Sequence, residues 1–278
     1  MTTSLALDSL QMLPLTSVRQ LLHYPANCDL LTLEKQSNDN YILGFAVSPK
    51  CIERAQRLRY LVFNEELGEG LAESVLTGLD RDEFDKTMHH LVLLNRSTGE
   101  LIGTYRLHPA AHALKHGRLY CANQYDVAAL SPYLGNLVEA GRACIAANHR
   151  NFATVMMLWK GLAVYMSIFD KRWLFGCVSM TTTDPDDGWR TLKTIRAEGA
   201  MHPELLLSPS ESFSCGDPSR ENDPDIQAIP LTKLFSAYLG VGAQVISLPS
   251  IDREFKTVDF LMMIDKQIVS FSALLKHT

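Results

Sequence analysis

The chain has 278 residues, of which 46% are apolar, and its formal net charge is −5. This length fits one large domain, or one domain with a substantial insertion, and the apolar content is that of an ordinary globular protein. The mildly acidic balance argues against a nucleic-acid-binding protein. No run reaches the roughly 18 apolar residues of a transmembrane helix, and the N-terminus lacks the pattern of a secretory signal.

The cysteines and histidines give no metal-site pattern. Six cysteines lack any C-x-x-C spacing, which favours reduced thiols in a cytoplasmic protein. His89 and His90 are adjacent, so in a strand they point to opposite faces, and no third ligand is evident. The sequence therefore predicts no metal.

Residues 1–40 show little periodicity and are expected to form an N-terminal arm. A short helix lying on a membrane is the less favoured alternative, because Pro14 interrupts its apolar face. Residues 41–47 are a strand candidate. A helix is predicted over residues 50–66, and the Gly-rich, acidic residues 67–87 are expected to form a loop.

The rest of the chain alternates strands and helices. Further strands are predicted at residues 91–94, 101–107, 137–145, 173–178, 245–248 and 258–264. Helices are predicted at residues 151–169 and 231–239, and residues 181–230 are expected to form a long irregular insertion and a candidate lid. This order predicts one α/β (α+β) domain over residues 41–278 with one central sheet.

The strand at residues 137–145 carries charged side chains in an apolar run. Glu139 and Arg142 are costly to bury unless they are paired or used. Gly141 between them is typical of a β-bulge or of a close backbone approach. A bulge frees a backbone N–H, so the strand is a candidate oxyanion-binding element for acyl transfer.

Several short motifs, in order, resemble those of a known family. They are Arg59-x-x-x-Phe63, Asp82-Glu83-Phe84-Asp85, Gly103-Thr104-Tyr105-Arg106-Leu107 and Glu139-x-x-Arg142. This set resembles acyl-homoserine-lactone synthases, and the flanking sequence is closer still to the ornithine-lipid N-acyltransferases, often labelled haemolysin-like. Both groups belong to the GNAT superfamily, and the resemblance covers about residues 45–264.

The resemblance implies a GNAT-like fold, with a mixed, mostly antiparallel sheet that splays open around the donor. It also implies transfer of a 3-hydroxyacyl chain from the phosphopantetheine arm of acyl carrier protein to an amino acid, most likely ornithine, giving lyso-ornithine lipid, with no bound cofactor. An amphiphilic product implies peripheral contact with the inner membrane. The alternatives are a synthase using another amine and a non-catalytic haemolysin-like membrane-binding protein.

Aminolysis of a thioester needs a proton acceptor and a stabilised oxyanion. Glu139 is the candidate acceptor, directly or through water, or else the group that holds the substrate ammonium. A structural ion pair between Glu139 and Arg142 is its alternative. An N–H near Gly141 or Arg142 is the candidate oxyanion donor.

The acidic loop supplies the candidate substrate-binding groups. Asp82 and Asp85 are expected to pair with Arg59 and Arg106 and, with Phe63, to shape the substrate pocket. The alternative is a solvated acidic loop. A cationic ornithine side chain also needs a carboxylate, for which Asp82, Asp85 and the turn at residues 184–187 are all candidates.

The start of the helix at residues 151–169 lacks the Gly-rich loop that cradles a pyrophosphate in acetyl-CoA-dependent relatives. Carrier-protein donors have no such pyrophosphate. His149, Arg150 and Lys160 are therefore candidates for binding pantetheine or the carrier protein, and an ordinary capped helix start at Asn148 or Asn151 is the alternative. Cys144 is expected to be a buried thiol rather than an acylated nucleophile.

Overall fold

The computed structural model describes residues 30–267, so residues 1–29 of the expected arm lie outside it. From Leu30 onward the arm prediction is wrong. Residues Leu30–Thr32 form β1, which pairs antiparallel with β2, and the Leu30 side chain is buried. A three-residue strand is too short to leave a periodic pattern in the sequence.

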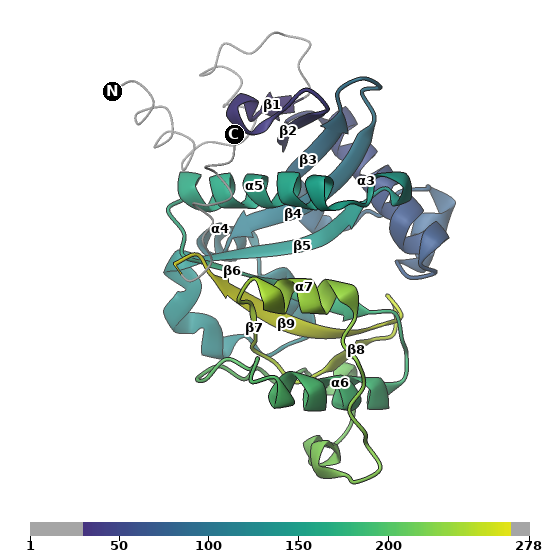
Figure 1. The fold of residues 1–278 in the computed structure, drawn as a ribbon, viewed down its shortest axis with the longest axis vertical. Helices are drawn as coiled ribbons and strands as arrows, with labels where there is room; N and C mark the ends of the chain where they lie inside the picture. Colours follow the sequence, from purple (N-terminus) through teal and green to yellow (C-terminus); the bar gives the residue numbers. More distant parts are fainter. Residues whose placement is uncertain (1–29, 268–278) are drawn as a thin grey trace.

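One nine-stranded mixed sheet runs through the molecule in the order β1-β2-β3-β4-β5-β6-β9-β7, and β8 pairs with β9 (Figure 1). The remaining strands are β2 Tyr41–Ala46, β3 His89–Asn95, β4 Leu101–Pro109, β5 Leu137–Ile145, β6 Trp173–Met180, β7 Gln244–Val245, β8 Ser250–Asp252 and β9 Thr257–Asp265. β5 and β6 are parallel, and the other pairings within the described residues are antiparallel. The predicted mixed, mostly antiparallel fold is thus confirmed.

Helices cover both faces of this sheet. α5 (Phe152–Ile168) crosses β2 to β5 on one face, whereas α3 (Pro49–Tyr60) lies against the other and continues into a π-helical turn, η2 (Leu61–Glu66). α4 (Ala110–His116) follows β4, and α7 (Lys233–Gly240) lies beside β9, where Phe235 meets Phe260 edge-on. The predicted helix at residues 50–66 therefore exists, with its last turn π-helical.

α5 forms as its sequence predicts. The Asn151 side chain accepts a hydrogen bond from the Thr154 amide and caps the first turn, and the Asn151 amide donates in turn to the Thr154 hydroxyl. Leu158, Leu162 and Met166 recur every four residues and are buried against the sheet.

The predicted irregular insertion at residues 181–230 is wrong in its first part. Residues Pro185–Ala197 form α6, which Asp184 caps at its N-terminus and Pro185 begins. Trp189, Leu192 and Ile195 are buried where α6 packs on β8 and β9. These three side chains have helical spacing. The prediction missed it because the surrounding Pro, Asp and Ser residues are typical of a loop.

The sheet opens into a fork between β5 and β6. Their register pairs run from Leu137–Trp173 to Glu139–Phe175 and stop there. A Cβ on Gly176 would lie 2.0 Å from the Ala140 carbonyl oxygen, so the strands meet closely just before they part. Beyond that point Ala143 on β5 and Ser179 on β6 are exposed. We call the β1–β5 side the first arm and the β6–β9 side the second arm.

Candidate functional site

A β-bulge lies on β5 where the fork begins to widen. Gly141 pairs with Arg106 and Cys144 with Thr104, so Arg142 and Ala143 together oppose Tyr105. The predicted bulge is therefore present, but Arg142 rather than Gly141 takes the left-handed conformation, with φ of 51°. A non-glycine residue adopts this φ at a cost, which its side-chain contacts offset.

The Arg142 guanidinium joins the two arms. Its Nε lies 3.1 Å from Asp80 Oδ2, and its Nη1 donates to the Tyr120 hydroxyl at 2.8 Å. It also lies over the Phe255 ring, 4.2 Å from the ring centroid, and Phe255 belongs to the turn between β8 and β9. The bulge residue is thus held against the second arm.

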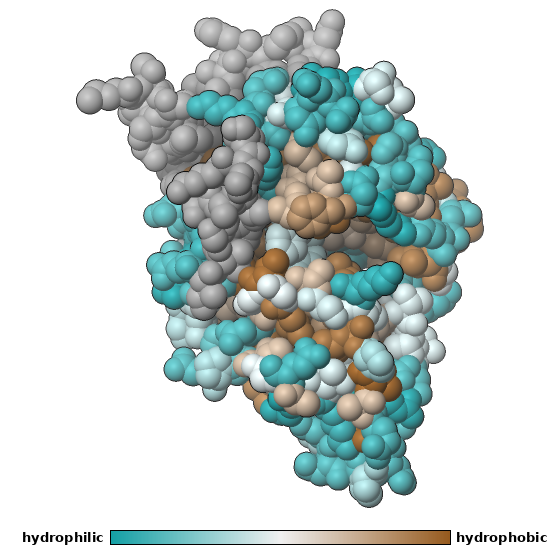
Figure 2. Space-filling view, viewed as in Figure 1, coloured by the Kyte–Doolittle hydropathy of each residue, from teal (hydrophilic) through white to brown (hydrophobic). Residues whose placement is uncertain are grey.

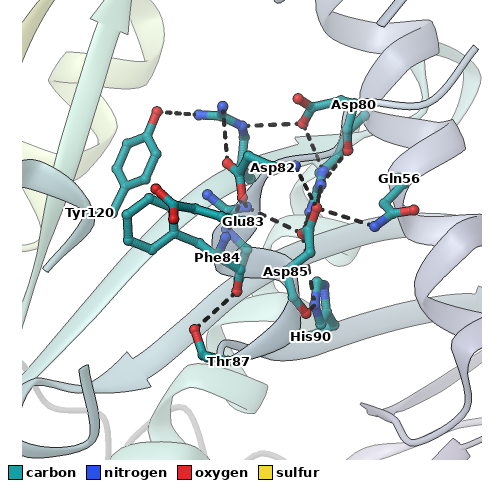
Figure 3. A network of polar contacts seen from close by, with 12 residues as sticks. Gln56, Asp80, Asp82, Glu83, Phe84, Asp85, Thr87, His90 and Tyr120 are labelled. Atoms are coloured by element: carbon teal, nitrogen blue, oxygen red, sulfur yellow. Dashed lines mark hydrogen bonds and ion pairs between the residues drawn. The ribbon is translucent and has the colours of Figure 1, made fainter. Parts of the chain in front are cut away.

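Arg59 of α3 is the centre of a buried ion-pair network. Figure 3 shows the three aspartates of this network, Asp80, Asp82 and Asp85. Its guanidinium binds both carboxylate oxygens of Asp85 at 2.9 Å, and its Nε lies 2.8 Å from Asp80 Oδ2. The Asp85 carboxylate also accepts from Gln56. Burial alone raises the pKa of Asp85, but the Arg59 and Arg106 guanidiniums hold it well below its usual value.

Arg106 of β4 completes the network. Its Nη1 lies 2.6 Å from Asp82 Oδ1 and 3.2 Å from Asp85 Oδ1. The expected pairing of Asp82 and Asp85 with Arg59 and Arg106 is confirmed, and the solvated-loop alternative is wrong. With Arg142 and Asp80 included, three guanidiniums balance three carboxylates inside the first arm.

Glu139 has both carboxylate oxygens occupied. The amides of Tyr120 and Cys121 each donate to it at 2.7 Å, and His108 Nε2 lies 2.6 Å from its Oε2. Burial raises its pKa, but these donors outweigh burial and hold the pKa below its ordinary value. The structural ion pair with Arg142 is not what holds Glu139, because Arg142 pairs with Asp80 and Asp82 instead.

The other predicted residues are more exposed. Phe63 meets Phe255 edge-on, with ring centroids 5.8 Å apart, and so spans the two arms. Arg150 forms an ion pair with Glu66 and donates to the Ile145 carbonyl, and His149 lies 4.0 Å from Glu100. Lys160 is half-buried on α5. Asn151 caps the start of α5, as expected from the alternative interpretation of this segment as an ordinary capped helix.

Aromatic side chains line the face of the sheet that carries α5 and α7. The Tyr105 and Tyr238 hydroxyls lie 2.6 Å apart, and Trp159 stacks on Tyr238 at 5.8 Å. Figure 2 shows apolar side chains gathered along the gap between α5 and α7. This face is suited to an acyl chain, whereas the charged network lies on the opposite face of the first arm.

Sequence reasoning did not single out Asp80, Tyr120 or Phe255. Asp80 is fully buried and pairs with two arginines, yet its sequence neighbourhood reads as an exposed acidic loop. Tyr120 and Phe255 lie in segments without periodicity, and only the fold brings them to Arg142.

Three other features complete the description of the site and its surroundings. Burial raises the pKa of the Cys144 thiol to about 12, so this cysteine is a buried thiol. Over residues 30–267, no three His, Cys, Asp or Glu side chains gather as a metal would require. In the same range, no helix is both long and apolar enough to cross a bilayer.

Several known proteins match this chain in sequence. Residues 58–160 match the acetyltransferase (GNAT) domain. The L-ornithine N(alpha)-acyltransferase of Rhodobacter capsulatus is 33% identical over 239 residues, which cover 83% of this chain and 92% of that protein. The enzyme of the same name from Brucella abortus is 28% identical, over 81% of this chain and 84% of its own.

Among solved structures, FeeM, an N-acyl amino acid synthase from uncultured soil microbes, aligns with a TM-score of 0.45 and 12% identity. That alignment covers 81% of this chain and 90% of FeeM. The acyl-homoserine-lactone synthase LasI aligns with a TM-score of 0.44 and 12% identity, over 82% and 93% of the two chains. By its match to the relative from Rhodobacter capsulatus, this chain belongs to the family of the L-ornithine N(alpha)-acyltransferases, a group of GNAT acyltransferases.

Proposed function

We propose that the protein transfers a 3-hydroxyacyl chain from acyl carrier protein to the α-amine of an amino acid, and that ornithine is this acceptor. The observation that carries the proposal is the open fork between β5 and β6, with a bulge on one edge and charged side chains beside it. The names of the curated relatives favour ornithine over other amines.

The fork is suited to hold a thioester between two strand edges. β5 past Glu139 and β6 past Phe175 leave their facing edges unpaired with each other, so backbone groups there are available to a pantetheine arm. We assign the oxyanion-binding N–H to the bulge at Arg142 and Ala143, next to Gly141. A fixed donor at this point stabilises the charge that forms when the amine attacks the thioester carbon.

The start of α5 favours a carrier-protein donor over CoA. The Thr154 amide, which a pyrophosphate-binding loop leaves available, is occupied by the Asn151 side chain. His149 and Arg150 place basic groups at that end of α5, and Lys160 lies midway along the helix. Basic groups form strong, charge-assisted hydrogen bonds with carboxylates and phosphates, which a carrier protein and its phosphopantetheine arm would present. We assign these three residues to carrier-protein or pantetheine binding.

The acceptor pocket lies on the side of Phe63, Arg142 and Phe255. Asp82, Asp85, Arg59 and Arg106 fix its wall, because each charge in that network is balanced by a neighbour. Glu139, the proton acceptor expected from the sequence, is proposed here as a positioning residue of this pocket. Its three donors make it a weak base as it stands, so we propose that it acts mainly by holding Tyr120 against Arg142, and that proton loss goes through water.

A lyso-ornithine lipid is amphiphilic, which favours a cytoplasmic enzyme in peripheral contact with the inner membrane. Mass spectrometry of lipid extracts tests the function. Cells expressing the wild type are expected to contain a new N-(3-hydroxyacyl)ornithine that cells expressing Glu139→Ala lack. A different N-acyl amino acid in the wild-type extract would show that the acceptor is an amino acid other than ornithine and would still support N-acyl transfer. The absence of any new N-acyl amine, with soluble protein present, would overturn the proposal.

A further inference from the structure

The second arm holds a buried carboxylate that no cation balances. Asp259 on β9 is 3% exposed, and no hydrogen-bond donor within residues 30–267 reaches its Oδ1. Within residues 30–267, no lysine, arginine or histidine forms an ion pair with Asp259 or with the neighbouring Asp252. A buried carboxylate without a countercharge destabilises the fold, so the presence of Asp259 at this position suggests that it binds a ligand or has another function.

The two carboxylates differ in how they are satisfied. Asp252 accepts from the Glu254 and Phe255 amides and from the Gln124 side chain at 2.7 Å, so it fixes the turn between β8 and β9. Among the described residues, Asp259 is approached instead by uncharged donors, the side chains of Ser179, Thr257 and Gln124. Burial, and to a lesser degree the charge of Asp252, raise the pKa of Asp259 to about 6, so it is largely ionised at neutral pH and lacks a countercharge.

Asp259 lies within reach of the fork. Its cross-strand neighbour on β6 is Ser179, which is exposed beyond the point where β5 and β6 part. Cys177, two residues earlier on β6, feels the negative charges of Asp259, Glu139 and Asp252 and the positive charge of Arg142. Cys177 of β6 therefore lies near both Arg142 of the bulge and Asp259 of β9.

The spacing suits a diamino acid. Two residues along a strand span roughly 6.7 Å, which separates Asp259 and Ser179 from the pair Cys177–Leu261 nearer the fork. An extended chain of three methylenes places its two amines roughly 6 Å apart. The two amines of one diamino acid thus have the spacing needed to reach the thioester and Asp259 together, and the second ammonium would supply the missing countercharge.

We propose that Asp259 is the specificity-determining residue of the acceptor pocket, and that it binds the side-chain ammonium of a diamino acid whose α-amine is acylated. The inference rests on the proposed function and deepens it. It selects a carboxylate on β9, rather than Asp82, Asp85 or residues 184–187, as the partner of the cationic side chain. Asp82 and Asp85 already pair with arginines, and Asp186 and Asp187 pair with Arg220 and Arg190.

The test compares ornithine with norvaline, which has the same carbon chain without the terminal amine. We expect the wild type to prefer ornithine in kcat/KM, and Asp259→Asn to lower the ornithine value roughly tenfold to hundredfold while leaving the norvaline value unchanged. Asp265→Asn on the same strand is the matched control, since Asp265 pairs with Arg172 at the far end of β9, and it is expected to keep the preference.

Calorimetric binding of ornithine and norvaline, without donor, gives a second readout that needs no turnover. Tighter binding of ornithine by the wild type, lost in Asp259→Asn, supports the inference even if no acyl transfer occurs. An unchanged ornithine preference in Asp259→Asn overturns the inference and leaves ornithine acylation standing. An equal loss with both amino acids assigns Asp259 to the α-amine and overturns it as well. A wild type with no preference for the cationic side chain in either readout overturns it together with the ornithine assignment.

Discussion

Near the fork, the two arms of the sheet differ in whether their buried aspartates are paired with cations. In the first arm, Arg59, Arg106 and Arg142 balance three aspartates. In the second arm, Asp252 and Asp259 have no cation among the described residues. This difference indicates two roles for buried charge. Paired charges hold the surrounding side chains in fixed positions, whereas a carboxylate without a cation can bind a positively charged substrate.

The largest expected effect is the removal of the central cation from the first arm. Arg59→Ala leaves Asp80 and Asp85 buried without it and is expected to lower the free energy of unfolding by about 3–5 kcal/mol. Arg57→Ala is the matched control on the same helix, because Arg57 is more than half exposed and its one ion pair within residues 30–267 is with Glu53. Its expected cost in urea denaturation is about 0.5 kcal/mol or less. Equal costs would mean that the network is not what stabilises the first arm.

The pH dependence of stability should differ between the arms. The folded-state pKa of Asp85 is depressed, so its stabilisation is present above the ordinary value of 3.8 and is lost as pH falls. The pKa of Asp259 is raised to about 6, so wild-type stability falls as pH rises from 4 to 6 on account of this group.

Asp259→Asn removes that second dependence. The unfolding free energy of Asp259→Asn minus that of the wild type is expected to grow by on the order of 2 kcal/mol between pH 4 and pH 7, without ligand. Urea unfolding at four pH values measures it. Parallel curves for the two proteins would show that Asp259 has an ordinary pKa and that the second arm carries no unbalanced charge.

The contrast between the arms also explains what the sequence predicts. Arg59, Asp82, Asp85 and Arg106 stand in short motifs with fixed spacing, so their pairing follows from the sequence alone. Asp259 lies in a strand that reads as apolar, and its lack of a cation is a property of the space around it. The same reason hid Asp80, because whether an aspartate in a loop is buried depends on what the loop packs against.

The fork itself is tested by its two glycines. Gly176→Ala places a Cβ 2.0 Å from the Ala140 carbonyl oxygen and is expected to cost about 1–3 kcal/mol in stability, because backbone must move. At Gly141 an added Cβ meets nothing within 4 Å, so Gly141→Ala is expected to change stability by less than about 0.5 kcal/mol. Thermal unfolding of both variants measures the difference. If both tolerate alanine equally, the arms do not meet as closely as described.

The smallest effect is expected where the arms meet on the apolar face. Tyr238→Phe removes the hydrogen bond between the Tyr105 and Tyr238 hydroxyls and keeps the ring that stacks on Trp159. Because a net hydrogen bond contributes about 1 kcal/mol, the variant is expected to lose about that much stability. The double variant with Tyr105→Phe measures the coupling, and additive losses would show that the hydroxyls do not interact.

The central claim is that acyl transfer takes place in the open fork beside the bulge. The most direct measurement is the rate at which purified protein forms N-(3-hydroxyacyl)ornithine from 3-hydroxyacyl carrier protein and ornithine, for the wild type and for Gly141→Val. The valine fills space beside the bulge that is empty in the wild type. We predict transfer by the wild type and at least a roughly tenfold lower rate in the variant, at an unchanged melting temperature. A full rate with the fork filled would contradict the claim.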